Sequence, residues 1–462
     1  MRYEPSVDVF KGSVMFKQKA LYTHLTGKSF LLFPFIANGS IPAVTDLEIV
    51  VGRYLCDIEQ REVTPIFLPD LLNSQDISVE EDQKESFKKI IQNLFFNSDG
   101  SVKPTSFQLL KHIECKESLE KKIAEYLSDV LGDREILRNN LMEASASSVN
   151  SSNVLERFVL SQVDMSSACN AEKDRLHYFR IEDSLTKVYN EDFEYIVKDP
   201  LRARTYIIPL LEFYFFSYTA QTCLQLSRFM DGERNEIIPL YFCLEWEKTS
   251  QSRNCYSNGW AFLSKSLKTI FAHANTLEIL NQTEDGSDVV DYIAIGESLK
   301  ANPELDAVYA GKIDKLTECY RSVITDSTSM NEYVKECNYS RATDASIRYL
   351  FESVRLQFEE VRESPYSAYA RQFDKFSDKF KKNRGRNGQM LNLNESTLIF
   401  LTKLAIKDKE KVRLNEIFSE FEKRGVFLDS ISKQGVTEYF TKLNLIETKS
   451  DSGDAMYVRR IL

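Results

Sequence analysis

Glycine and proline are scarce in this 462-residue chain. It contains 16 Gly and 11 Pro, whereas average usage would place their sum near ~12% of residues. Because these two residues form most tight turns, their scarcity argues against a turn-rich sandwich or barrel. We therefore expect a mainly α fold, built as an α-rich multidomain protein with a short β element in its central body.

Cysteine pairs and long apolar runs are also missing. The eight cysteines are scattered, with no CxxC pair and no histidine at zinc-finger spacing, which fits a reducing compartment. The N-terminus lacks the apolar segment of a signal peptide. The most apolar stretch, Tyr206 to Tyr218, contains Pro209 and Glu212 and is shorter than the ~20 residues of a membrane span. We expect a cytoplasmic protein with no membrane contact, in which this stretch is a buried helix.

Known catalytic and phosphate-binding motifs are absent or incomplete. Gly27-Lys28-Ser29 resembles the end of a phosphate-binding loop, but Tyr22 occupies the position of the required glycine. We therefore expect no nest of backbone N–H groups there. The four histidines lie far apart and match no hydrolase or metalloprotease pattern. The sequence predicts no catalytic residues, no metal and no cofactor.

Two acidic clusters deserve comparison with nuclease sites. Pro69-Asp70 followed by Asp82-Gln83-Lys84 has the PD…(D/E)xK spacing of many nucleases, but a capping box at Ser78 places the second part on a charged helix. Glu245-Trp246-Glu247-Lys248 ends an apolar strand near 237–246. Two carboxylates and a lysine there could hold a metal and a water, so a metal-dependent nuclease using Glu245, Glu247 and Lys248 stays an alternative.

Linker composition divides the chain into three expected regions. A mostly helical N-terminal region covers 1–143, a central helical body covers 154–378, and a C-terminal module covers 389–462. The small polar run at 144–153 and the Gly-rich, basic run at 379–388 are expected linkers, the second one flexible. Within the body, hydrophobic spacing predicts helices at 211–230, 260–281 and 343–363.

The C-terminal module has the order of elements of a winged helix. Asn394 can cap a first helix that runs to Ala405, and a short strand at 412–414 precedes a second helix that ends near Gly425. Ser432 can cap a third helix. Two strands, at 445–449 and 455–461, flank a turn at 451–454. We therefore predict a winged-helix-like module.

In such a module the third helix enters the major groove and the hairpin touches phosphate. The residues expected to face DNA, in the third helix and the hairpin, are Lys433, Gln434, Thr437, Thr441, Lys442, Lys449, Arg459 and Arg460. Residues 371–462 carry 19 basic and 13 acidic side chains, a net charge of +6, so the rest of the chain carries −16. A basic end on an acidic body indicates that any DNA contact is local, and it also permits the acidic body to dock on a basic partner. Asp451 and Asp454 at the turn would repel DNA and could point the hairpin at a protein partner instead.

Two segments carry a resemblance to a known family. One runs from Pro239 through Glu245-Trp246-Glu247-Lys248 to Gly259-Trp260, and the other runs from Phe421-Glu422-Lys423-Arg424-Gly425 to Val458. Together with the chain length, they resemble the DptG family of bacterial DNA-phosphorothioation-dependent restriction. Neither segment is a motif of known chemistry, so the resemblance brings no catalytic residues.

The resemblance implies a role in antiviral defence. In these systems, modification enzymes replace a non-bridging phosphate oxygen by sulfur, and restriction proteins act on DNA that lacks the mark. DptF-like and DptH-like subunits would be the partners, and they would supply the ATPase motifs. We therefore expect a non-catalytic subunit that assembles its partners and contacts DNA through the C-terminal module. A stand-alone winged-helix regulator and the nuclease described above are the alternatives.

Overall fold

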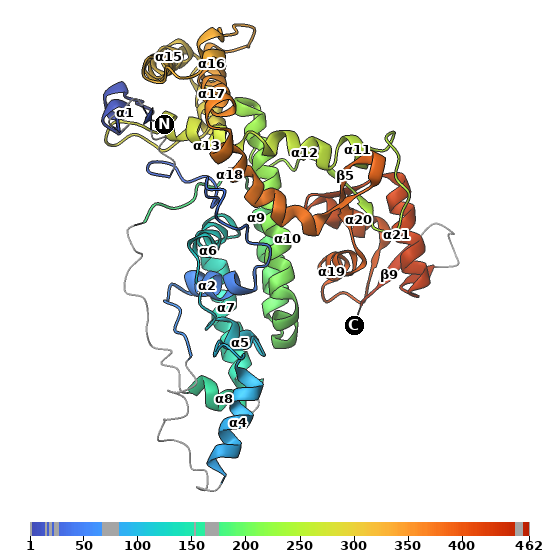
Figure 1. Cartoon of the computed structure of the whole chain (residues 1–462). Helices are drawn as coiled ribbons and strands as arrows, with labels where there is room; N and C mark the ends of the chain where they lie inside the picture. The colour runs from blue at the N-terminus through green and yellow to red at the C-terminus, as the bar shows by residue number, and fades with distance from the viewer. Residues whose placement is uncertain are drawn as a thin grey trace.

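The computed structural model describes residues 2–13, 16–17, 21–22, 27–66, 83–151, 154–161, 175–448 and 456–461. Over these residues the chain is mainly helical, as the sequence predicts, and its strands are short. One long helix, α10 (Pro200–Ser227), runs through the middle of the molecule. N-terminal helices lie along one side of it, and the C-terminal elements lie along the other (Figure 1).

Helix α10 is the centre of the hydrophobic core. It starts at Asp199, whose carboxylate accepts a hydrogen bond from the N–H of Arg202, and Pro200 occupies the first turn. The helix is buried on nearly all sides from Ile207 onward, so its apolar residues show no single stripe. Ring contacts such as Phe216–Phe380, at 4.6 Å between centroids, connect it to later helices. The predicted buried helix at 206–218 is confirmed, but α10 starts eleven residues before the expected 211–230 helix.

Helices surround α10 on both sides. The N-terminal elements are α1 (Val7–Ser13), β1 (Phe16–Lys17), β2 (Leu21–Tyr22), α2 (Glu48–Glu59), α4 (Lys84–Phe95), α5 (Phe107–Leu110), α6 (Ser118–Val130), α7 (Arg134–Ser151), α8 (Val154–Ser161) and α9 (Ser184–Val197). After α10 come η1 (Phe229–Asp231), α11 (Asn254–Ser257), α12 (Trp260–Leu267), α13 (Ile270–Leu280), α14 (Tyr292–Ala301), η2 (Pro303–Leu305), α15 (Asp306–Val323), α16 (Thr328–Glu332), α17 (Ala342–Val361) and α18 (Glu363–Phe376).

Some of these helices have other bounds than the sequence predicts. The helix expected over 260–281 is two helices, α12 and α13, because the chain turns at Lys268 and Thr269. Most of the expected linker at 144–153 belongs to α7, which continues to Ser151. The capping box at Ser78 lies outside the described residues. Among those described, no helix combines the length and apolarity that a membrane crossing needs.

A four-stranded sheet joins the body to the C-terminal elements. Its order is β4 (Lys381–Asn383), β5 (Gln389–Leu393), β3 (Leu240–Leu244) and β7 (Val426–Leu428). Strand β3 pairs in parallel with both β5 and β7, whereas β4 and β5 form an antiparallel hairpin. The predicted strand in the body is therefore confirmed, and it lies at the centre of a sheet that takes two strands from residues after 388.

The prediction of a flexible link at 379–388 is wrong, because the segment has regular structure. This segment forms the end of η3 (Ser377–Phe380), strand β4 and the one-turn helix η4 (Gly385–Asn387). Four of its five basic side chains pair with protein groups; for example, Lys381 donates to Asp374, and Arg384 donates to the carbonyl of Leu244 at 2.7 Å. A charged run can thus be structured when most of its charges have partners, which composition alone does not reveal.

The C-terminal elements follow the predicted order. They are α19 (Glu395–Ile406), β6 (Lys411–Arg413), α20 (Leu414–Glu422), β7, α21 (Ser430–Lys442), β8 (Ile446–Thr448) and β9 (Met456–Arg459). Strands β6, β9 and β8 form an antiparallel sheet in that order. Asn394 caps α19, and Gly425 has a φ of 83°, as predicted. The cap of the third helix is Asp429, however, not Ser432. The turn at 451–454 lies outside the described residues.

Candidate nucleic-acid interface

The three-stranded sheet β6-β9-β8 has one buried face and one open face. Val412 and Val458, which face each other across β6 and β9, are buried. Side chains alternate along a strand, so their neighbours point the other way. Lys411 lies opposite Arg459, and Arg413 lies opposite Tyr457. The open face therefore carries three basic side chains and a tyrosine, and we name these four residues the basic sheet face.

The basic sheet face keeps an excess of positive charge. Glu447, opposite Tyr457 on β8, accepts a hydrogen bond from Lys411 at 2.8 Å and one from Arg459 at 3.4 Å. The hydrogen bond from Lys411 holds the pKa of Glu447 below its usual value. Arg413 donates to the hydroxyl of Tyr457 at 3.4 Å. On this face, the described residues of the three strands contribute three cations and one carboxylate, and Glu410 and Glu416, which lie just outside the strands, act on Lys411 and Arg413. The excess of positive charge on the strands themselves favours an anionic partner.

Helix α21, the expected DNA-reading helix, is fixed to the body at its first turn. Arg253 forms two hydrogen bonds with the carboxylate of Asp429, at 3.0 and 2.5 Å, and a third with the hydroxyl of Ser432 at 2.8 Å. Ser432 in turn donates to the carboxylate of Glu247 at 2.9 Å. Gly435 packs on β3 so closely that a Cβ would lie 2.8 Å from a methyl group of Leu244. One side of α21 is therefore covered by the body.

The predicted DNA-facing residues of α21 are not all turned outward. The Lys433 ammonium lies 3.0 Å from Glu422 and 5.3 Å from the ring centre of Phe418, so this side chain turns toward α20. Gln434 donates to Glu438 on the same helix at 2.9 Å. Thr437 and Thr441 donate back to carbonyls one turn earlier. Lys442 is exposed at the end of the helix. The Lys433 side chain is thus 37% accessible but already paired with a carboxylate of α20, a contact that helical spacing does not reveal.

The two predicted hairpin residues that the structure describes, Arg459 and Arg460, point to different sides of the sheet. Arg459 belongs to the basic sheet face. Arg460 points away from it, with its guanidinium 3.7 Å from Asp408. Lys449 lies outside the described residues. Lys411, Arg413 and Tyr457 are not among the residues predicted from the sequence, although the sequence contains a signal for them. Both Lys411-Val412-Arg413 and Tyr457-Val458-Arg459 alternate a polar residue with a buried valine, the pattern of a half-buried strand.

The two carboxylates after β3 form ion pairs with other parts of the chain. Glu245 is exposed and pairs with Lys382 at 2.9 Å, whereas Glu247 is nearly buried and pairs with Arg253 at 3.1 Å. The two carboxylates thus serve separate contacts. Trp246 stacks on Tyr439 of α21 with 4.8 Å between ring centres. Within the part of the chain that the structure describes, no group of three or more His, Cys, Asp or Glu side chains is placed to hold a metal. Pro69, Asp70 and Asp82 of the other nuclease-like pattern lie outside the described residues.

The prediction that the segment at Gly27 forms no nest of backbone N–H groups is wrong. The backbone N–H groups of Gly27, Lys28, Ser29 and Phe30 all donate to the carboxylate of Glu278, at 2.8 to 3.3 Å. These residues therefore do form a nest for an anion. The anion is a side chain of the protein itself, so the nest ties the N-terminal segment to α13.

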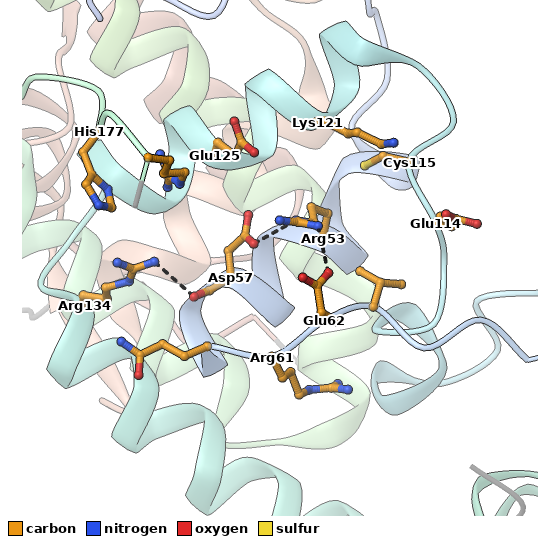
Figure 2. Close-up of a pocket in the computed structure, with 13 residues that line it drawn as sticks. Arg53, Asp57, Arg61, Glu62, Glu114, Cys115, Lys121, Glu125, Arg134 and His177 are labelled. Atoms are coloured by element: carbon orange, nitrogen blue, oxygen red, sulfur yellow. Dashed lines mark hydrogen bonds and ion pairs between the residues drawn. The ribbon is translucent and has the colours of Figure 1, made fainter. Parts of the chain in front are cut away.

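A polar cavity of about 530 Å³ lies between α2, α6 and the start of α7 (Figure 2). Arg53 pairs with Asp57 at 2.8 Å and with Glu62 at 3.6 Å. Arg175, also on the wall, is neutralised by Asp129 at 2.8 Å. Burial raises the pKa of Asp57 to about 6, against the opposing effect of Arg53. Positive and negative side chains balance in this cavity, so it does not select a ligand of either sign.

No protein-family model matches the chain, and no curated protein matches it either.

Proposed function

We propose that this chain is a non-catalytic subunit of a DNA-phosphorothioation-dependent restriction complex of the bacterial cytoplasm. Its C-terminal elements form a winged helix that contacts DNA through the basic sheet face, and its acidic body docks DptF-like and DptH-like subunits. The observation that carries the DNA contact is the convergence of Lys411, Arg413 and Arg459 around Tyr457 on one open face. The family assignment rests on the resemblance of the two sequence segments.

The basic sheet face supports phosphate contact more strongly than base reading. Lysine and arginine neutralise phosphates, and these contacts position a protein on DNA without reading its sequence. Base reading by a winged helix uses the first turns of the third helix, but here Arg253 and Glu247 hold that part of α21 against the body. We therefore propose weak sequence preference and a binding free energy that comes mostly from counterion release.

The test is duplex binding by the full chain at several salt concentrations. Each phosphate contact contributes about 0.9 to the slope of log affinity against log salt. Arg413→Ala and Arg459→Ala should each lower the slope by about one. Lys433→Ala, whose side chain turns toward α20, is the matched control and should leave the slope unchanged. Equal slopes for the wild type and the Arg413→Ala Arg459→Ala double variant would remove the DNA assignment.

The subunit role is tested in cells and by co-purification. Tagged chain should bring down DptF-like or DptH-like proteins when they are co-expressed, and its deletion should abolish restriction of unmodified DNA. Normal restriction in the deletion strain would contradict the role. Isolated protein should neither hydrolyse ATP nor cut DNA with Mg²⁺. Cleavage that disappears in a folded Glu245→Ala Glu247→Ala variant would establish the nuclease alternative.

A further inference from the structure

A second cavity, of about 370 Å³, lies where the start of α10 meets α19 and the C-terminal residues. Its walls include three aromatic and three basic side chains, which are Tyr195, Tyr206, Phe400, Arg202, Lys403 and Arg460. We propose that this cavity binds a nucleoside phosphate, with the phosphate held by Arg202 and Arg460 and the base stacked on Tyr206. Such a ligand is either a free nucleotide or one nucleotide of a DNA strand, and the strand case rests on the proposed function.

The phosphate position is defined by two guanidinium groups that converge on one point. Arg202 and Arg460 come from segments far apart in the sequence, yet each lies near the same carboxylate oxygen of Asp408, at 3.8 and 3.7 Å. Both distances are longer than an ordinary hydrogen bond, and Asp408 is 59% exposed. A phosphate oxygen at this point could accept hydrogen bonds from both groups, with the geometry for which arginine is suited. Asp408 then acts as a loosely held competitor.

Arg202 is held ready for such a ligand. Its guanidinium lies 3.9 Å from the ring centre of Tyr195 and donates to the carbonyl of that residue at 2.9 Å. The carboxylate of Asp199, also on the wall, caps α10 by accepting from the backbone N–H of Arg202 at 2.8 Å. Because the side chain is already fixed, binding a ligand costs little additional ordering.

The aromatic wall distinguishes a nucleotide from a simple anion. Tyr206 and Phe400 stack at 5.6 Å with 22° between their planes, and Phe400 is buried while Tyr206 is half-buried. The Lys403 ammonium lies 5.2 Å from the ring centre of Tyr206. An aromatic surface beside cations is the combination with which proteins hold single nucleotides, by base stacking and phosphate pairing. Inorganic phosphate would use only the cations.

The cavity also adjoins the basic sheet face. Arg460 follows Arg459 directly, and its backbone N–H donates to the carbonyl of Glu410 at 2.9 Å, next to Lys411. Figure 1 shows α19 and the C-terminus on the same side of the lower part of α10, with β9 beyond α19. A strand that crosses the sheet face could therefore place one nucleotide in the cavity without leaving the surface of the protein.

The first test measures binding of deoxyadenosine monophosphate to the full chain by calorimetry. It should bind about tenfold more tightly than inorganic phosphate or deoxyadenosine, because only the nucleotide uses both parts of the site. Asp408→Asn should tighten binding, since it removes the competing carboxylate. This gain cannot come from misfolding. Tyr206→Leu should weaken binding about tenfold, whereas Tyr206→Phe, which keeps the stacking surface, should not.

The outcomes separate this proposal from the proposed function. No saturable nucleotide binding at millimolar concentration, or weaker binding by Asp408→Asn, would overturn the cavity assignment and leave the salt slope of duplex binding as it was. Nucleotide binding that survives in the Arg413→Ala Arg459→Ala variant would support the cavity even if the sheet face does not bind DNA. If Arg460→Gln weakens both nucleotide and single-stranded DNA, the ligand is part of a strand. Loss of nucleotide binding alone identifies a free nucleotide.

Discussion

Breaking the buried ion pair between Arg424 and Asp192 should strongly destabilise the protein. Arg424 follows α20, Asp192 belongs to α9, and neither side chain is exposed to solvent. The guanidinium donates to the two carboxylate oxygens at 2.7 and 2.6 Å. Tyr214 of α10 donates to the same carboxylate at 2.7 Å, and Lys407 lies 3.2 Å away. This cluster joins three parts of the chain in one buried site.

The expected magnitude follows from what each substitution leaves behind. Arg424→Met removes one partner and leaves the Asp192 carboxylate buried with fewer donors, which should cost about 3–5 kcal/mol of unfolding free energy. Arg424→Met combined with Asp192→Leu removes both charges and keeps apolar volume. Because a buried ion pair loses much hydration energy when it forms, the double variant should be much closer to wild type than either single variant.

Urea unfolding followed by tryptophan fluorescence can measure these differences, since Trp246 and Trp260 lie at the junction between body and C-terminal elements. Lys423→Met, at an exposed neighbour of Arg424 whose side chain is 63% accessible, is the matched control and should change stability by less than about 1 kcal/mol. The reasoning is refuted if Arg424→Met costs no more than this control, or if the double variant loses the sum of the two single losses.

Three further predictions concern pH, close packing and charge. Burial raises the pKa of Asp57 from 3.8 to about 6, so its charged form is disfavoured in the folded state and wild-type stability should fall as pH rises from about 4 through 6. Asp57→Asn should lack this loss, giving a relative gain of about 2 kcal/mol at pH 8 over pH 4. Parallel pH profiles of the two proteins in urea unfolding would contradict this. Gly52→Ala in α2 would place a Cβ 2.4 Å from the carbonyl oxygen of Leu110 and should lower the melting temperature. Gly311→Ala in α15, with open space around it, should instead increase the free energy of unfolding by about 0.5–1 kcal/mol and raise the melting temperature. Equal shifts in the two variants would show that the contact with the Leu110 backbone does not matter. Glu447→Gln, which removes the carboxylate from the basic sheet face, should tighten duplex binding at low salt, and unchanged affinity in the same titration would place the DNA elsewhere.

The helices of the C-terminal module were predictable because several of them carry a local signal at one end. Asn394 supplies a side-chain cap, and Gly425 supplies a left-handed residue at a helix end. The start of α10 was missed although Asp199-Pro200 is a good helix start, because the turns before Ile207 are largely exposed, with Leu201 74% accessible, and carry no stripe of apolar residues. Strand β7 has only three residues, and its pairing with β3 joins residues far apart in sequence, so no local pattern indicates it.

In the candidate interface, too, the local features were predictable from the sequence and the long-range contacts were not. The alternation of polar and apolar residues in 411–413 and 457–459 is visible in the sequence. The register that brings Lys411 opposite Arg459 depends on the pairing of β6 with β9, which local sequence does not reveal. The direction of Lys433 depended on Glu422, eleven residues away on another helix. Spacing on one helix gives the face of a residue and does not say what covers that face.

These long-range contacts also decide how the C-terminal module can be studied. A fragment of residues 389–462 would keep α19 to β9 but would separate β5 and β7 from β3, the strand between them. It would also leave Arg424 without Asp192 and Asp429 without Arg253. Unpaired strand edges promote aggregation, so the fragment should be less soluble than the full chain, and its failure to bind DNA would report on folding. Because Arg253 and Glu247 hold α21 against the body, DNA bound at the neighbouring basic sheet face would have a fixed direction relative to the body.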